Sequence, residues 1–206
     1  MAKVKMSRKM TSIDMTAMCD VAFLLLTFFI LTATAKQQEP LPVDTPASTR
    51  ETKLPDTNLA TITIGNKGTV FFGMTDRDIR VETLNLMSQQ YNVSFTEDEK
   101  AKFALVETFG VPIQELKQII AMKSSDRNKE GFQKGIPHDS LDNQLAYWIQ
   151  FARKATIDLH DEKEIAIAIK GDAKEQYPEI RKVMDILQDQ KINSFNLVTG
   201  LRSENF

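Results

Sequence analysis

The sequence predicts an α+β protein with a single N-terminal transmembrane helix, a Pro-rich linker and a small β-β-α-β-α-β domain that carries a largely helical insertion. Three observations support this prediction: a long apolar run near the N-terminus, a cluster of prolines after it, and strand and helix periodicities after Leu59. The expected divisions are a tail at 1–13, the transmembrane helix at 14–36, the linker at 37–57 and the folded domain at 58–206, with the insertion at about 76–138.

The apolar run from Met15 to Ala35 reads MTAMCDVAFLLLTFFILTATA. As a helix it spans about 31 Å, which is enough to cross the hydrocarbon core of a bilayer. Asp20 carries the only charge in this run. A carboxylate at that depth costs about 2.5–3.5 kcal/mol, a cost that a purely structural anchor has no reason to carry. Asp20 is therefore the main candidate functional residue, with proton transfer as its expected role.

Thr16, Asp20, Thr27 and Thr34 fall within about 40° of one another on a helical wheel. Such a stripe is expected to face a protein partner or a water-filled gap, because lipid offers no hydrogen bonds. The alternative for the threonines is that their hydroxyls bond to carbonyls one turn earlier. Asp14 is expected to be an interfacial group that favours the helix dipole, with a proton relay as the alternative.

The charges on either side of the helix predict its orientation. Residues 1–13 carry four basic side chains and no acidic one, whereas residues 36–56 carry three basic and four acidic side chains. The positive-inside rule then places the N-terminus in the cytoplasm and the rest of the chain across the membrane. A cleaved signal peptide is the competing interpretation, because a basic start, an apolar core and Ala33-Thr34-Ala35 match that pattern; Asp20 argues against it.

Overall composition excludes several classes of function. The chain has 26 Lys+Arg against 28 Asp+Glu, so no basic surplus indicates nucleic-acid binding. Its one cysteine, Cys19, lies in the apolar run, which leaves no disulfide or cysteine-based zinc site in the exported part. His138 and His160 lack metal-ligand spacing, and Asp161-Glu162 indicates a solvated turn. With no nucleophile–base set either, we expect no enzyme, no cofactor and no metal.

The linker at 37–57 contains Pro40, Pro42, Pro46 and Pro55 among polar residues. Fully extended it reaches about 70 Å. It is either a passive tether or a segment that adds as a strand to a partner.

The folded domain is expected to begin with a hairpin, because 59–64 alternates, 65–68 contains two turn glycines and 69–72 returns. A helix from Ser140, a strand at 164–170, a helix opened by Pro178 and a strand at 194–199 follow. The two helices are expected to cover one face of a small mixed sheet. Trp148 and Tyr177 are expected in the core or at a dimer face. The predicted apolar helix faces are Leu141, Leu145, Trp148, Ile149 and Ala152, and Ile180, Val183, Met184 and Leu187.

The insertion carries local helix signals but no catalytic or ligand signature. Thr96 and Glu99 fit a capping box. Pro112 is expected to open a helix that carries Leu116, Ile119 and Ile120, and 124–135 is expected to be a loop. The insertion is either an added docking surface or a structural elaboration.

Two blocks of sequence carry a family resemblance. The first reads Ile13-Asp14-Met15-Thr16-Ala17-Met18-Cys19-Asp20 before the Leu- and Phe-rich run, and the second contains Gly171-Asp172, Tyr177, Val183-Met184-Asp185-Ile186-Leu187 and Leu197-Val198-Thr199. Together they resemble the ExbD/TolR family, whose membrane signature is Ile-Asn-x-Thr-Pro-x-x-Asp; Asp14 and Ala17 replace its Asn and Pro. Val43-Asp44-Thr45-Pro46 resembles the Val-x-Leu-Pro linker motif of that family, with Thr45 in place of Leu.

This resemblance implies a single-pass inner-membrane protein whose C-terminal domain is periplasmic. It implies a homodimer, in contact with membrane lipid and held by a multi-span proton-channel oligomer of the ExbB/TolQ type. The domain would act on a TonB- or TolA-type transmitter protein, and Asp20 would carry the proton. A driver of TonB-dependent transport is favoured. A TolR-type subunit for envelope maintenance, a cell-wall-anchored stator and an exported binding module remain as alternatives.

Overall fold

The structure is a computed structural model that describes residues 15–33, 39–48, 53–65, 68–129, 131–139, 142–160, 164–173 and 177–201. The chain divides into two compact units, residues 1–37 and 38–206, which are considered separately. The expected N-terminal tail lies outside the described residues.

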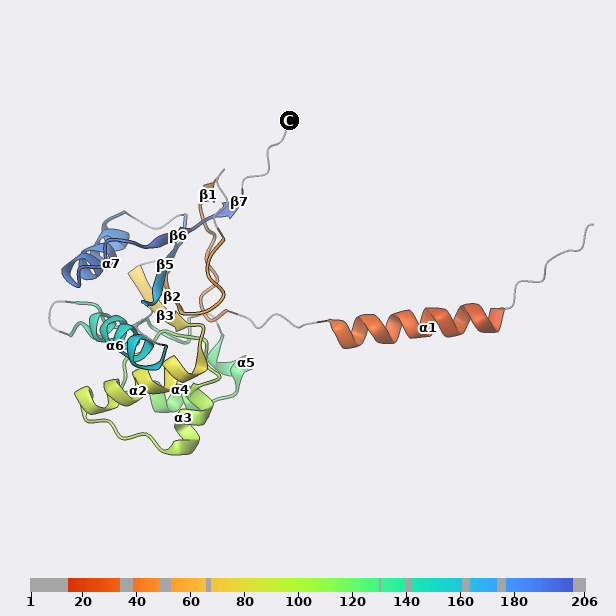
Figure 1. Ribbon diagram of the computed structural model, residues 1–206, viewed down its shortest axis with the longest axis horizontal. Coiled ribbons are helices and arrows are strands. Elements are labelled where there is room, and N and C mark those ends of the chain that lie inside the picture. The colour runs from red at the N-terminus through yellow and green to blue at the C-terminus, as the bar shows by residue number, and fades with distance from the viewer. Residues whose placement is uncertain are drawn as a thin grey trace, which may run out of the picture. The chain divides into compact units, whose positions relative to one another are not determined.

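The first unit contains helix α1, Met15–Thr32 (Figure 1). Leu, Met, Ala and Phe dominate it, and neither Gly nor Pro interrupts the backbone ladder, which continues to a bond from the Ala33 N–H to the Phe29 carbonyl at 2.9 Å. None of its residues is buried within the chain. Among the described residues, α1 is the one helix that is long and apolar enough to cross a membrane.

The second unit is built on a mixed sheet with the strand order β4-β3-β2-β5-β6. The hairpin strand β2 runs antiparallel to β3 and parallel to β5, and β6 is parallel to β5. A separate parallel pair joins β1 to β7. This confirms the predicted α+β class and mixed sheet. The strands are β1 Ala47–Ser48, β2 Leu59–Gly65, β3 Thr69–Met74, β4 Thr108–Phe109, β5 Ala166–Gly171, β6 Asn196–Val198 and β7 Gly200–Leu201.

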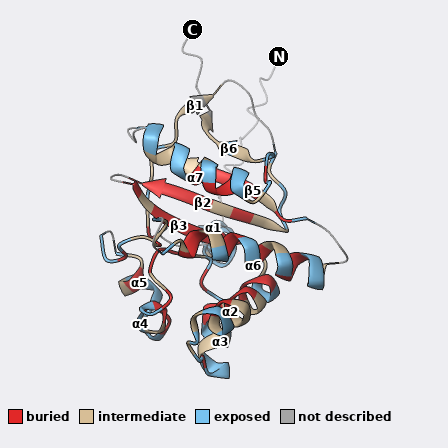
Figure 2. Cartoon of the chain, turned by 90° about the vertical axis from the view of Figure 1, so that its left-hand side faces the viewer, coloured by how far each residue is buried: buried red, intermediate tan, exposed pale blue. Residues whose placement is uncertain are grey.

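Helices α6, Gln144–Leu159, and α7, Tyr177–Asp189, cover the same face of the sheet (Figure 2). Alternate residues of β2 point to that face because a strand has a period of two. The residue that follows α7 also reaches α6, since the Gln190 side-chain amide donates to the Ala146 carbonyl at 2.8 Å. The buried residues of these elements are Ala60, Ile62 and Ile64 of β2, Leu145, Trp148, Ile149 and Ala152 of α6, and Val183, Ile186 and Leu187 of α7.

The insertion extends the same core and is partly helical, where a largely helical insertion was expected. It contains α2 Arg77–Tyr91, α3 Glu97–Phe103, β4, α4 Leu116–Ala121 and α5 Ser124–Arg127. The predicted capping box is confirmed, with Thr96 accepting from the Glu99 N–H and Glu99 accepting from the Thr96 N–H. An aromatic cluster joins the insertion to α6: the Phe109 ring lies 4.7 Å from that of Trp148 and 5.3 Å from that of Phe103.

The opposite face of the sheet is also covered. At β3 the cover is a loop of the insertion, whose Gly135 N–H donates to the Gly110 carbonyl and whose Ile136 N–H donates to the Val70 carbonyl, at 2.7 and 2.8 Å. Gly110 lies so close to the Phe71 ring that a Cβ there would be 2.5 Å from it. At β5 the cover is formed by residues 39–48 (Figure 1).

Four local predictions need correction. Helix α6 begins at Gln144, capped by Asn143, and not at Ser140. Residues 124–127 form one helical turn where a loop was expected, and the short strands were missed, because elements this short carry no readable periodicity. Tyr177 is 66% exposed, which overturns the core position but leaves the dimer face as a prediction, whereas Trp148 is fully buried in the core.

Candidate functional site

One candidate site, in the first unit, is the polar side of α1. Asp20 is exposed on this helix, and Thr16 and Thr27 share its side. The Thr27 hydroxyl donates to the Leu24 carbonyl at 2.9 Å, so its own helix satisfies it. Thr32, on another side of the helix, does the same with the Phe28 carbonyl at 2.8 Å. Asp20 is thus the charged side chain on this stripe, and it is exposed. Thr34 and Asp14 lie outside the described residues.

A second candidate site, in the second unit, is the segment formed by residues 39–48, called here the docked segment. It lies on the sheet face opposite α6 and α7, where Gly65 and Lys170 point outward. Pro40 is buried, and Leu41 lies over Gly65, where an added Cβ would be only 2.6 Å from a Leu41 methyl carbon. Glu39 forms an ion pair with Lys170 of β5. Part of the expected linker therefore packs as part of the folded unit.

Main-chain bonds hold the rest of the docked segment. The Ala173 N–H donates to the Asp44 carbonyl at 2.7 Å, and the Gly200 N–H donates to the Pro46 carbonyl at 2.9 Å. The segment then pairs as β1 with β7. In the predicted docking motif, Val43, Thr45 and Pro46 are half-buried and Asp44 is exposed. The two main-chain bonds of the motif, through the Asp44 and Pro46 carbonyls, do not depend on the identity of the side chain at position 45.

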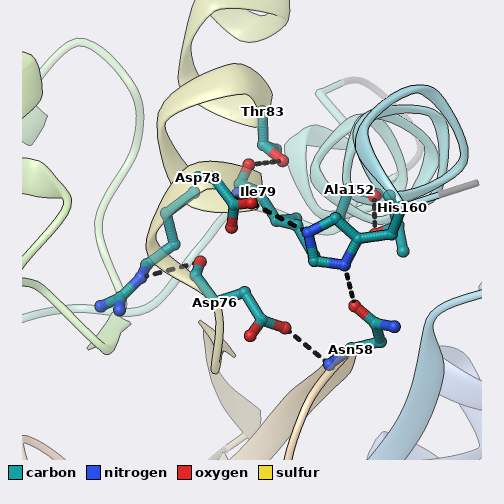
Figure 3. Close-up of polar contacts among 9 residues, drawn as sticks. Asn58, Asp76, Asp78, Ile79, Thr83, Ala152 and His160 are labelled. Carbon is teal, nitrogen blue, oxygen red and sulfur yellow. Dashed lines mark hydrogen bonds and ion pairs between the residues drawn. The ribbon is translucent and has the colours of Figure 1, made fainter.

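A third candidate site, also in the second unit, is a polar network around Asn58, the residue before β2 (Figure 3). Asn58 has a left-handed backbone with a φ of 53°, and its N–H donates to the Asp76 carboxylate at 2.6 Å. Asp76 is the N-cap of α2, but its side chain makes no bond to that helix. The Asp76 carboxylate, which in this position would usually cap the helix, therefore accepts from the residue before β2 instead.

His160, the C-cap of α6, completes this network. Its Nε2 lies 2.8 Å from a carboxylate oxygen of Asp78, in the first turn of α2, and its Nδ1 contacts the side-chain oxygen of Asn58. The hydrogen bond from His160 holds the pKa of Asp78 below its ordinary value, although partial burial opposes this shift. Three elements that are far apart in sequence are thus tied together by side chains.

Arg80 closes the α2 side of the network. Its buried guanidinium donates to the carbonyls of Thr75 and Asp76 at 3.2 and 3.3 Å. Burial lowers the pKa of Arg80, and the Glu107 carboxylate opposes that shift. Sequence reasoning found no metal-ligand spacing at His160 and gave it no other role, and it did not single out Asn58, Asp76, Asp78 or Arg80. No local pattern marks them, because their contacts cross separations of up to 102 residues.

Comparison with known proteins gives one family. The family described as "Biopolymer transport protein ExbD/TolR" matches residues 6–201, and neither a curated protein nor a solved structure matches the chain. The match includes Asp20, the docked segment and every strand that the structure describes in the folded unit. Members of this family are non-enzymatic transport components that work with partner proteins in a membrane complex, and the apolar helix α1 fits a single-pass membrane protein. The chain belongs to the ExbD/TolR family of biopolymer transport proteins.

Proposed function

We propose that this protein is the inner-membrane subunit of an ExbB–ExbD-type motor that uses the proton motive force to energise TonB-dependent transport across the outer membrane. The observation that carries this proposal is Asp20, the one charged side chain of the apolar helix α1, in a chain of the ExbD/TolR family. In this proposal α1 crosses the inner membrane with its N-terminus in the cytoplasm, and the folded unit is periplasmic.

The energy that the proton motive force supplies per proton is enough to change the charge state of one side chain. A driving force of about 100–200 mV supplies about 2.3–4.6 kcal/mol for each proton moved. A charged Asp20 needs a polar partner on the surrounding multi-span oligomer, whereas a protonated Asp20 can move past apolar surface. Alternation between the two states would rotate or step a pair of α1 helices in a homodimer. Thr16, Thr27 and Thr34 would line the path, and Asp14 would relay protons at its cytoplasmic end.

The docked segment supplies a way to pass this motion on. While it is docked, only residues 33–38 separate α1 from the folded unit, which is about 24 Å of extended chain. If it is released, the tether extends to Asn58 and reaches about 90 Å. The backbone groups that the release exposes at β7 and Ala173 are then available to a strand of a TonB-type transmitter. Release of the docked segment would move the residues of the docking motif, which are Val43, Asp44, Thr45 and Pro46.

The test is Asp20→Asn, with Asp20→Glu as the conservative variant. Uptake of a ferric chelate is measured in cells, together with membrane level and co-purification of the multi-span partner. Loss of uptake in Asp20→Asn with an intact complex supports the proposal, and partial recovery in Asp20→Glu is expected because the glutamate also titrates. Thr27→Val and Thr32→Val form a matched pair, of which only the first alters the stripe.

A TolR-type subunit of a Tol envelope-maintenance motor is the second candidate, since the family match covers both types. The same cells distinguish the two. Normal chelate uptake with new sensitivity to detergent would assign the chain to envelope maintenance. Normal uptake and a normal envelope in Asp20→Asn would contradict a motor role for Asp20 in either pathway.

A further inference from the structure

Arg127, at the end of the short helix α5 in the insertion (Figure 1), is a buried cation, and among the residues that the structure describes it has no partner for its charge. Arg127 is 9% exposed, and its Nε is fully enclosed with no hydrogen-bond acceptor. Burial lowers the pKa of Arg127, and no charged neighbour adds to that shift or opposes it. A buried charge that nothing compensates is costly in a folded protein, so this one needs a physical explanation.

The guanidinium of Arg127 is closed at one edge and open at the other. Its Nε is enclosed, whereas its two terminal nitrogens, which also lack acceptors among the described residues, are not enclosed and so reach solvent. Such a group can receive an anion only end-on, through both terminal nitrogens at once. The two oxygens of a carboxylate match that arrangement, whereas a single carbonyl oxygen cannot fill both bonds.

The backbone that carries Arg127 is held on both sides. Its N–H donates to the Lys123 carbonyl at 3.1 Å, and its carbonyl accepts from the Gln133 side-chain amide at 2.9 Å. The oxygen of the same Gln133 amide accepts from the Gly110 N–H, just after the edge strand β4, at 2.7 Å. Gln133 is buried, so this bridge fixes the loop to the edge of the sheet. The guanidinium therefore stands on a preorganised backbone, which keeps the ordering cost of binding low.

The charges of this loop favour a negatively charged occupant. Residues 123–134 contain four basic and two acidic side chains, in a chain whose net charge is −2. Of the two acidic side chains, Asp126 forms an ion pair with Lys129 at 2.9 Å, and Glu130 lies outside the described residues. The loop is thus locally positive, and a carboxylate brought by another molecule would meet attraction there.

We propose that Arg127 is the anchor of a docking site for an acidic segment of a partner protein, whose carboxylate is bound end-on by the two terminal nitrogens. A long, thin acidic side chain can reach a guanidinium that lies below the surface. Three exposed residues of the same loop, Phe132, Lys123 and Lys134, supply apolar and basic contacts for the flanking residues of that segment. The insertion then serves as an added docking surface. This site does not involve Asp20, so the proposed motor function stands or falls separately.

The test uses the full chain in non-ionic detergent micelles at low salt, with hexaglutamate as the probe and hexaglutamine as its uncharged counterpart. The reporter is the NMR signal of the Gln133 side-chain amide, which donates to the Arg127 carbonyl and so reports on this site and not on peptide bound elsewhere. Hexaglutamate is expected to shift this signal saturably, and hexaglutamine to leave it in place. Arg127→Met is expected to raise the hexaglutamate concentration for half the shift at least about thirtyfold, because a buried charge pair loses one partner. Arg127→Lys is expected to lose most of the response as well, since an ammonium group cannot bind two oxygens end-on.

A control and a second measurement separate binding from folding. Arg181→Met is the matched control, because Arg181 of α7 is exposed and the substitution removes the same charge. Its hexaglutamate response is expected to stay close to that of the unaltered chain. Arg127→Met is expected to unfold at the same or a higher denaturant concentration than the unaltered chain, because it removes a buried charge that no described residue compensates.

Four results would overturn the proposal. The first is the absence of a saturable shift with hexaglutamate, and the second is an equal response in Arg127→Met. The third is an equal shift with inorganic phosphate at the same concentration, which would assign Arg127 to a small free ion. The fourth is a lower unfolding midpoint in Arg127→Met, which would make Arg127 a structural residue of the insertion.

Discussion

Leu41 lies directly over Gly65, in the one outward position of β2 where the sheet has no side chain. An added Cβ at Gly65 would come within 2.6 Å of the Leu41 Cδ2, closer than real Cβ contacts allow. The missing side chain thus creates the space in which the docked segment meets the sheet. This relationship joins a residue of the expected linker to the hairpin and converts part of a tether into part of a domain.

Replacing Gly65 is therefore expected to loosen the docked segment. In Gly65→Val the branched side chain occupies the space of Leu41, and exchange of the Ala173 amide, which donates to Asp44, is expected to rise about tenfold. Gly171 in the neighbouring strand is the matched control, because a Cβ there meets only the Ile180 Cδ1 at 3.5 Å. Unchanged Ala173 exchange in Gly65→Val, measured by hydrogen exchange on the full chain, would contradict the role of this contact.

The ion pair between Glu39 and Lys170 makes a second, weaker contribution to docking. The Lys170 side chain is 20% exposed and that of Glu39 44%, so solvent screens the pair and about 0.2–1 kcal/mol is expected. Lys170→Glu is expected to raise Ala173 exchange about two- to fivefold at low salt, because two carboxylates then oppose each other. The charge-reversed double variant Glu39→Lys with Lys170→Glu is expected to restore the original rate of Ala173 exchange. An effect that persisted unchanged at about 1 M salt would point to packing and not to charge.

The aromatic cluster is expected to hold the insertion to the rest of the core. Phe109 is fully buried between Phe103 and Trp148, and Phe109→Ala is expected to lower the free energy of unfolding by about 3–5 kcal/mol. Phe132→Ala is the control within the same insertion, since Phe132 is 47% exposed, and its effect is expected to stay below about 1 kcal/mol. Both are measured by denaturant unfolding followed through Trp148 fluorescence. A small effect of Phe109→Ala would mean that the insertion folds independently of the sheet.

The capping box of α3 gives a prediction with a pH dependence. Thr96→Ala is expected to cost about 1 kcal/mol, and Thr96→Ser to cost little, because serine keeps the capping hydroxyl. The hydrogen bond from the Thr96 N–H lowers the pKa of Glu99. Its stabilising effect is therefore present above the ordinary glutamate value and is lost as the pH falls through the lowered one. Unfolding curves at neutral and acidic pH test this prediction. Thr96→Ala is expected to lower the free energy of unfolding by the same amount or less at acidic pH, and a larger loss at acidic pH would be inconsistent with the capping box.

The sequence by itself determined the features that depend on local pattern. The apolar run with Asp20, the β2–β3 hairpin, the buried faces of α6 and α7, and the Thr96 capping box all follow from periodicity, charge and cap chemistry within a few residues. The family resemblance followed as well, because its motifs are short and lie in the correct order.

Only the tertiary structure decided where distant residues meet. A polar, Pro-rich stretch resembles a linker whether or not it packs, and its docking depends on an outward glycine of β2, a lysine of β5 and the N–H groups of Ala173 and Gly200. His160 resembles a surface histidine until the fold brings Asn58 and Asp78 to its two nitrogens. Contacts across such separations leave no periodic signal in the sequence, because chain closure and core packing, and not local propensity, create them.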